Sequence, residues 1–150
     1  MICESVMNAQ PVTALGTSTI SETLDMLIEH RLISIAVVNA HGKFLGQFGL
    51  HHLLGLIMPK AATMDRSLDD LGFVTESIDQ LKTRLAHCLP RKVSEYLEEE
   101  SIAVHPETSL AKGLMLLYKH GGDLPVVDAH GKLVGIVSPW DIVSKIKNNK

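Results

Sequence analysis

The residues best suited to chemistry lie near the carboxyl end of the chain, between Gly135 and Asp141. If Ser138 is the N-cap of a helix, Pro139 is its first residue and Asp141 its third. The free amide donors and positive dipole end of such a helix favour a phosphate group, and the cap hydroxyl can add a hydrogen bond to it. A carboxylate one turn into the helix can accept both hydroxyls of a ribose. The alternative is a purely structural role, in which Ser138 and Asp141 only cap the helix and stabilise it by about 1 kcal/mol.

Other chemistry has less support in the sequence. The chain contains eight histidines, but the adjacent pair His51-His52 is poorly placed to share one ion. No histidine pair has the i, i+4 spacing with an acidic partner that is typical of a zinc site. The chain also has no Ser-His-Asp order at elbow spacing, no glycine-rich phosphate loop and no Cys-His signature. We therefore expect neither a metal site nor an enzyme, and no catalytic residues.

The segment that carries Ser138 belongs to an internal repeat, which decides the architecture. Ile35 to Gly46 reads IAVVNAHGKFLG and Leu124 to Gly135 reads LPVVDAHGKLVG, with seven of twelve positions identical at a spacing of 89 residues. Upstream, helical positions match at a spacing of 90, and residues 3–7 lie opposite residues 93–97. The chain is therefore predicted to be two copies of one unit.

Each copy reads as β-α-β-β-α. An extended piece (11–15; 101–105) precedes a helix, and Thr19 with Glu22 has the spacing of a capping box at the first helix start. Two strands joined by a glycine turn follow, and then a second helix. Since one unit has too small a core to be stable alone, we predict an α/β fold of tandem repeats packed with pseudo-two-fold symmetry. The predicted divisions are repeat 1 at 1–59, a helical connector at 60–92 and repeat 2 at 93–150. The connector is expected to contain a helix from Thr75 to Pro90.

The net charge, the apolar runs and the cysteine spacing of the chain indicate which classes of partner it does not bind. The formal net charge is -3 and the basic residues are scattered, whereas nucleic-acid binders concentrate positive charge on one face. No apolar run is long enough to cross a bilayer. The two cysteines, Cys3 and Cys88, have neither metal nor redox spacing. These features predict a cytoplasmic protein that binds neither nucleic acid nor membrane.

The order of elements, and the segment LPVVDAHGKLVGIVS followed by PWDIV, resemble the CBS domain. Two copies resemble a CBS pair, or Bateman module, and we expect it to be a stand-alone one. The resemblance implies a regulatory module that binds an adenosine compound such as AMP, ADP, ATP or S-adenosylmethionine in a cleft between the two units, with no other cofactor. It also implies a homodimer and an unidentified regulated protein. The alternative is a constitutive structural or protein-interaction module with vestigial nucleotide sites.

The resemblance also implies roles for individual residues. Ser138 would contact phosphate and Asp141 ribose, and the adenine would be held by Ile102, Ala103, Asp123, Leu124 and Pro125. In the first copy, Gly49 and His52 stand where Ser138 and Asp141 stand in the second. A weaker second site is therefore expected there, formed by Thr13, Ser34 and Ile35.

Overall fold

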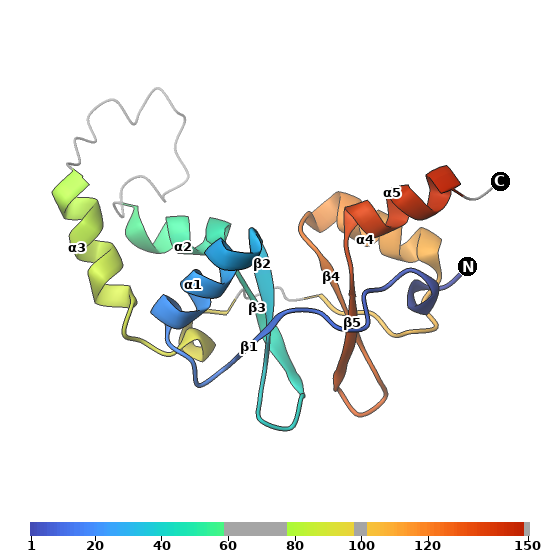
Figure 1. The fold of residues 1–150 in the computed structure, drawn as a ribbon, viewed down its shortest axis with the longest axis horizontal. Helices are drawn as coiled ribbons and strands as arrows, with labels where there is room; N and C mark the ends of the chain where they lie inside the picture. The colour runs from blue at the N-terminus through green and yellow to red at the C-terminus, as the bar shows by residue number, and fades with distance from the viewer. Residues whose placement is uncertain (59–77, 98–101, 149–150) are drawn as a thin grey trace.

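The computed structural model describes residues 1–58, 78–97 and 102–148, and it confirms the tandem α/β architecture (Figure 1). The first repeat contains β1 (Thr13–Leu15), α1 (Ile20–His30), β2 (Ser34–Val38), β3 (Phe44–Gly49) and α2 (Leu50–Ile57). The second contains α4 (Leu110–His120), β4 (Leu124–Val127), β5 (Leu133–Val137) and α5 (Pro139–Asn148). In Figure 1 the four helices lie on one side of the molecule and the tips of the two hairpins on the other.

The two sheets follow the same plan. β1 pairs in parallel with β2, which pairs antiparallel with β3. In the second repeat β4 pairs antiparallel with β5, and Val104 forms a single parallel bridge to Val126. That bridge is the counterpart of the pair Ala14 and Val37 in the first repeat. Of the predicted extended piece at 101–105, Ser101 lies outside the described residues.

Local sequence explains the helix starts and the turns. The Thr19 side chain accepts a hydrogen bond from the Glu22 amide at 3.1 Å, and Ser109 caps α4 in the same way. Such N-caps satisfy donors that have no helical partner. In the hairpins, Asn39 Oδ1 and Asp128 Oδ1 each accept two amides of their own turn. These bonds hold the pKa of Asp128 below its ordinary value, the Lys132 amide being the largest cause.

The leading segments of the two repeats are exchanged. A 3-10 turn at Cys3–Ser5 packs on the second repeat, where the Cys3 side chain is fully buried beside α4. Its counterpart, Val93–Tyr96, packs on the first repeat, with Val93 fully buried in that core. The backbone contacts match in detail, since the Cys3 amide donates to Thr108 and the Val93 amide to Ser18. Each core is therefore completed by a segment from the other copy.

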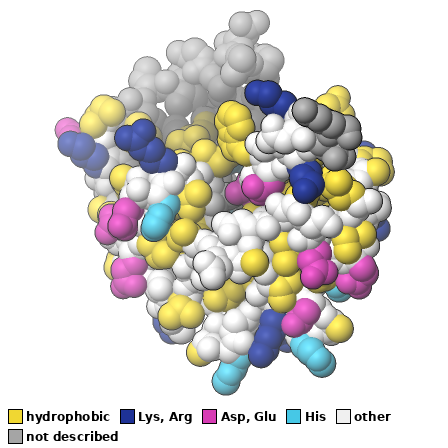
Figure 2. All heavy atoms as spheres, turned by 45° about the vertical axis from the view of Figure 1, so that its right-hand side comes forward, with side chains coloured by type: hydrophobic (Ala, Val, Ile, Leu, Met, Phe, Trp, Pro, Cys, Tyr) yellow, Lys and Arg dark blue, Asp and Glu magenta, His cyan; other side chains and the backbone are white. Residues whose placement is uncertain are grey.

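The hairpin tips meet across the pseudo-two-fold axis. Lys43 and Lys132, which are equivalent in the repeat, form an antiparallel bridge with each other. The Phe44 amide donates to Gly131 and the Leu133 amide to Gly42. The described surface shown in Figure 2 carries basic and acidic side chains in a mixed distribution. None of the helices in the described ranges combines the length and apolarity needed to cross a bilayer.

The connector contributes α3 (Ile78–Cys88), a helix where the sequence predicts one; Thr75, its expected N-cap, lies outside the described residues. The Cys88 side chain enters the first core, and Leu85 packs against that core. Arg84 donates to the Ile57 carbonyl at 3.4 Å, close to the end of α2. The described part of the connector is thus attached to the first repeat.

Candidate functional site

A pocket of about 500 Å³ lies between the two repeats at the start of α5, and we call it the α5 pocket. One wall comes from the second repeat and contains Ser138, Trp140 and Asp141 at the start of α5. Asp123, which lies just before β4, belongs to the same wall. The opposite wall comes from the first repeat, from the segment just before β1 and from the segment that leaves α1 and enters β2. The lining residues of that wall are Pro11, Val12, Arg31, Leu32, Ile33, Ser34 and Ile35.

The start of α5 is a reciprocal capping arrangement. The Ser138 amide and hydroxyl both donate to Asp141 Oδ2 at 2.9 Å, and the Asp141 amide donates to Ser138 Oγ at 3.2 Å. The helix begins at Pro139, as the sequence predicts. Both side chains are half-buried. Capping and pocket lining therefore occur together, because the same two residues that close the helix start also form part of the cavity wall.

The structure divides the other predicted residues between two pockets. Asp123, Ser34 and Ile35 line the α5 pocket with Ser138 and Asp141, although the sequence placed Ser34 and Ile35 in a separate, weaker site. Ile102 and Leu124 line a second pocket together with Asp123. The remaining three are not in the lining of either pocket: Pro125 is fully buried in β4, Ala103 is exposed, and Thr13 is half-buried in β1.

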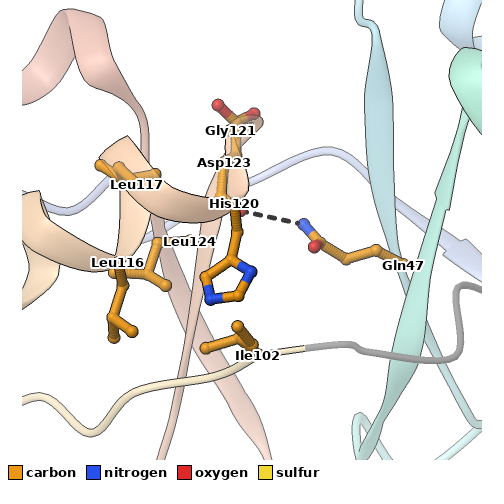
Figure 3. A pocket seen from close by; sticks show the side chains of 8 residues that line it. All are labelled: Gln47, Ile102, Leu116, Leu117, His120, Gly121, Asp123 and Leu124. Carbon is orange, nitrogen blue, oxygen red and sulfur yellow. Dashed lines mark hydrogen bonds between the residues drawn. The ribbon is translucent and has the colours of Figure 1, made fainter.

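The second pocket, which we call the Gln47 pocket, has a volume of about 210 Å³. The Gln47 side chain, only 8% exposed, extends from β3 across the repeat interface and donates to the Asp123 carbonyl at 3.3 Å (Figure 3). Sequence reasoning did not single out Gln47 or its neighbour in this pocket, His120. The available signal was a polar side chain between Gly46 and Phe48, where the second repeat has Ile136.

The charged residues that line the α5 pocket are Asp123, Asp141 and Arg31. Burial raises the pKa of Asp123 above its ordinary value, and the nearby charge of Asp141 raises it further. Both effects disfavour the ionised form of Asp123. In the described ranges, no group of three or more His, Cys, Asp or Glu side chains is arranged to hold a metal ion.

This pKa shift gives a stability prediction. Because the folded protein holds the Asp123 proton to higher pH than the unfolded chain, the group stabilises the fold below its unfolded pKa, and that contribution is lost as pH rises through the folded pKa. At neutral pH, Asp123→Asn is expected to increase the free energy of unfolding by up to about 1 kcal/mol, since solvent screens a partly exposed carboxylate. Urea unfolding at neutral pH and near pH 4 checks this. The advantage of the variant should shrink at the lower pH, and an equal advantage at both would contradict the assignment.

The sequence of this chain is similar to those of known proteins. The CBS domain model matches residues 3–59 and 93–148. The L-aspartate semialdehyde sulfurtransferase of Methanocaldococcus jannaschii is 37% identical over 89 residues, which are 55% of this chain and 17% of that protein. The chloroplastic CBS domain-containing protein CBSX1 of Arabidopsis thaliana is 26% identical over 130 residues, 85% of this chain and 55% of that protein. The chain thus spans about half, or less, of the length of these relatives.

Solved structures share the fold. CBSX2 of Arabidopsis thaliana superposes with a TM-score of 0.75 at 19% identity, covering 99% of this chain and 98% of that one. Another CBSX2 structure, described as a complex with AMP, has a TM-score of 0.72 at 19% identity and covers 97% and 96%. The CBS domain pair of protein MJ0100, in complex with 5′-methylthioadenosine and S-adenosyl-L-methionine, has a TM-score of 0.67 at 20% identity and covers 100% and 98%.

Proposed function

The chain belongs to the CBS-domain family, and we propose from this premise that it is a regulatory module that binds an adenosyl compound in the α5 pocket. The observation that carries the proposal is the α5 pocket itself, which joins Asp141 of one repeat to Ser34 and Ile35 of the other. Its volume lies within the range of small-molecule sites. Related CBS pairs bound to AMP, S-adenosyl-L-methionine or 5′-methylthioadenosine support this class of ligand.

The proposed pose uses both walls of the α5 pocket. Within the described part of the chain, Asp141 Oδ2 accepts two hydrogen bonds from Ser138, whereas no such bond is made to Oδ1. Oδ1 therefore has the capacity to accept from the ribose diol. The base would lie on the apolar side, against Ile35 and Val12, with backbone groups of the Ile33–Ile35 stretch at its polar edge. A ligand held in this way touches both repeats at once.

We propose that this bridging is the regulatory event. A ligand shifts a conformational equilibrium only through different affinities for the two states, and a compound bound between two repeats must respond to how they are arranged. The role would be regulatory and not catalytic, acting on an unidentified protein. Both cysteines are free and buried, which supports a reducing, cytoplasmic location.

Thermal unfolding of the purified chain tests the proposal with AMP, ADP, ATP, S-adenosylmethionine and 5′-methylthioadenosine, with GTP as the base control. A ligand that binds only the folded state stabilises it by about 2.7 kcal/mol at a hundredfold excess over its dissociation constant. We expect a rise in melting temperature with at least one adenosyl compound and none with GTP. An absence of any rise at millimolar concentration would overturn the ligand-sensing proposal and favour the interaction module.

We further propose that the chain forms a homodimer through its helical face. Exposed apolar side chains occur at equivalent places in the two repeats: Ile28 on α1 matches Tyr118 on α4, and Leu54 on α2 matches Val143 on α5. The exposed fractions of Ile28 and Tyr118 are 67% and 90%. A pseudo-symmetric apolar face suits an isologous contact with a second copy, in which the same surface is used on both subunits.

Tyr118→Lys is therefore expected to weaken the dimer, raising its dissociation constant about tenfold or more, as loss of an aromatic interface residue often does. Sedimentation equilibrium measures this directly. The matched control is Leu15→Lys, because Leu15 is also an exposed apolar residue but lies in the strand β1 and not on a helix. A wild-type chain that remains monomeric at all concentrations tested would contradict the homodimer.

A further inference from the structure

A buried glutamine joins the two repeats at the Gln47 pocket. Gln47 lies in β3 of the first repeat, and its Nε2 donates to the main-chain carbonyl of Asp123 in the second repeat at 3.3 Å. The equivalent position of the second repeat is Ile136. Since an apolar side chain fits there, packing alone does not require a glutamine, and burying an amide is unfavourable unless it is hydrogen-bonded. The contact to Asp123 therefore indicates a specific use of this side chain.

Asp123 lies between the two pockets and lines both of them. Its carbonyl faces Gln47, whereas its carboxylate is turned away from the Gln47 amide (Figure 3). The charge of Asp141, which lines the α5 pocket, is one of the causes that raise the pKa of Asp123, so the Asp123 carboxylate lies on the α5 side. One residue thus connects a hydrogen bond in the Gln47 pocket to the wall of the α5 pocket.

The chain that leads into Asp123 has no side chains with which to fix it. Gly121 and Gly122 precede Asp123 with φ angles of 70° and 69°, in the left-handed region that glycine adopts without steric cost. In the first repeat the corresponding link contains Leu32, whose side chain packs against the first core. The second repeat has no such residue between its helix and β4. A contact from the other repeat can supply the missing anchor.

Building on the ligand-sensing function proposed above, we infer that Gln47 is a positioning residue for the α5 pocket: it anchors the main chain of Asp123 and thereby fixes the Asp123 side chain in the pocket wall. Gln47 is not among the described residues that line that pocket, so it acts through Asp123. Because the anchor comes from the first repeat, the wall is complete only in the arrangement of the repeats that allows the hydrogen bond. A ligand that needs this wall favours that arrangement.

Gln47→Met tests the inference, since methionine has a similar length but no donor. For each of AMP and S-adenosylmethionine that the wild-type chain binds, isothermal titration should show binding about threefold or more weaker in the variant, because the ligand must then order Asp123 itself. Gln47→Ile, which copies the residue of the second repeat, should show the same loss. Leu53→Ala is the matched control: it truncates a buried side chain of the first core outside the described lining of both pockets. It should lower the melting temperature and leave the affinity unchanged.

A second readout needs no ligand. The signal of the Asp123 carboxyl carbon, followed across pH by nuclear magnetic resonance, reports the pKa of that group. Without its anchor Asp123 can turn toward solvent and away from Asp141, the two changes that remove the causes of its raised pKa. The pKa of Asp123 should therefore fall toward its ordinary value in Gln47→Met and stay raised in Leu53→Ala.

The two readouts separate the inference from the function on which it rests. Wild-type affinity in Gln47→Met, or weaker binding with an unchanged Asp123 pKa, would overturn the positioning role and leave the ligand-sensing function standing. Failure of both probes, and of the other adenosyl compounds, to bind the wild-type chain would instead overturn the ligand-sensing function. The pKa comparison would then still decide whether Gln47 fixes Asp123.

Discussion

Replacing Asp141 by alanine is expected to weaken binding of an adenosyl ligand about tenfold or more, because a ribose diol would lose a charged acceptor for its two hydroxyls. The same change is expected to cost about 1 kcal/mol of stability, because Asp141 Oδ2 accepts from both the amide and the hydroxyl of Ser138. Titration calorimetry measures the first effect and urea unfolding the second.

Ser138→Ala separates these two effects. It removes the hydroxyl that joins the cap but leaves the carboxylate in the α5 pocket, so it should lose similar stability while keeping most of the affinity. Asp141→Asn is a second control, since the amide oxygen can still accept from the Ser138 amide while the charge is lost. Equal loss of affinity in Ser138→Ala and Asp141→Ala would contradict a direct role for the carboxylate.

Val93→Asp is expected to unfold the protein, or to cost more than about 4 kcal/mol, because it places a charge in an apolar core. Val93 is fully buried in the core of the first repeat although it lies at the start of the second copy in the chain. The next residue provides a matched control: Ser94 is exposed, so Ser94→Asp should be tolerated. Urea unfolding followed by circular dichroism distinguishes the two variants. A folded and stable Val93→Asp protein would contradict the exchange of leading segments.

The features that local chemistry determines could be predicted from the sequence. Identical turn residues at a spacing of 89 indicated two copies, and both turns indeed use the same side-chain contacts, from Asn39 and Asp128. Thr19 and Ser138 stand as N-caps where the sequence placed helix starts. In each case the interacting groups lie within four residues of one another, so spacing alone specifies the contact.

The sequence predicted that the two copies pack on each other with a cleft between them, but not which residues of each copy meet there. The repeat shows that Cys3 and Val93 are equivalent positions, but it does not say in which core each side chain is buried. In the structure Val93 is buried in the core of the first repeat and Cys3 in the core of the second. The grouping of binding residues has the same cause. The family resemblance grouped Ile102 and Leu124 with Asp141, whereas in the structure they line the Gln47 pocket, and the α5 pocket combines Asp141 with Ser34 and Ile35 of the other repeat.

The same packing distinguishes the two pockets. The two pockets are lined by equivalent positions of the two repeats. One of these positions is Gln47 in the first repeat and Ile136 in the second, and the Gln47 side chain crosses the interface between the repeats to donate a hydrogen bond to the Asp123 carbonyl. The remaining Gln47 pocket is less than half the volume of the α5 pocket and falls below the usual range for small-molecule sites. We therefore expect one adenosyl ligand per chain, held in the α5 pocket.

The most direct measurement is a crystal structure of the full chain grown with a saturating adenosyl compound that raises its melting temperature. We predict density for one ligand in the α5 pocket, with its ribose hydroxyls at Asp141 and its base against Ile35. Density for the ligand in the Gln47 pocket or on the outer surface, with the α5 pocket empty, would contradict the proposal that the chain senses its ligand between the start of α5 and the opposite repeat.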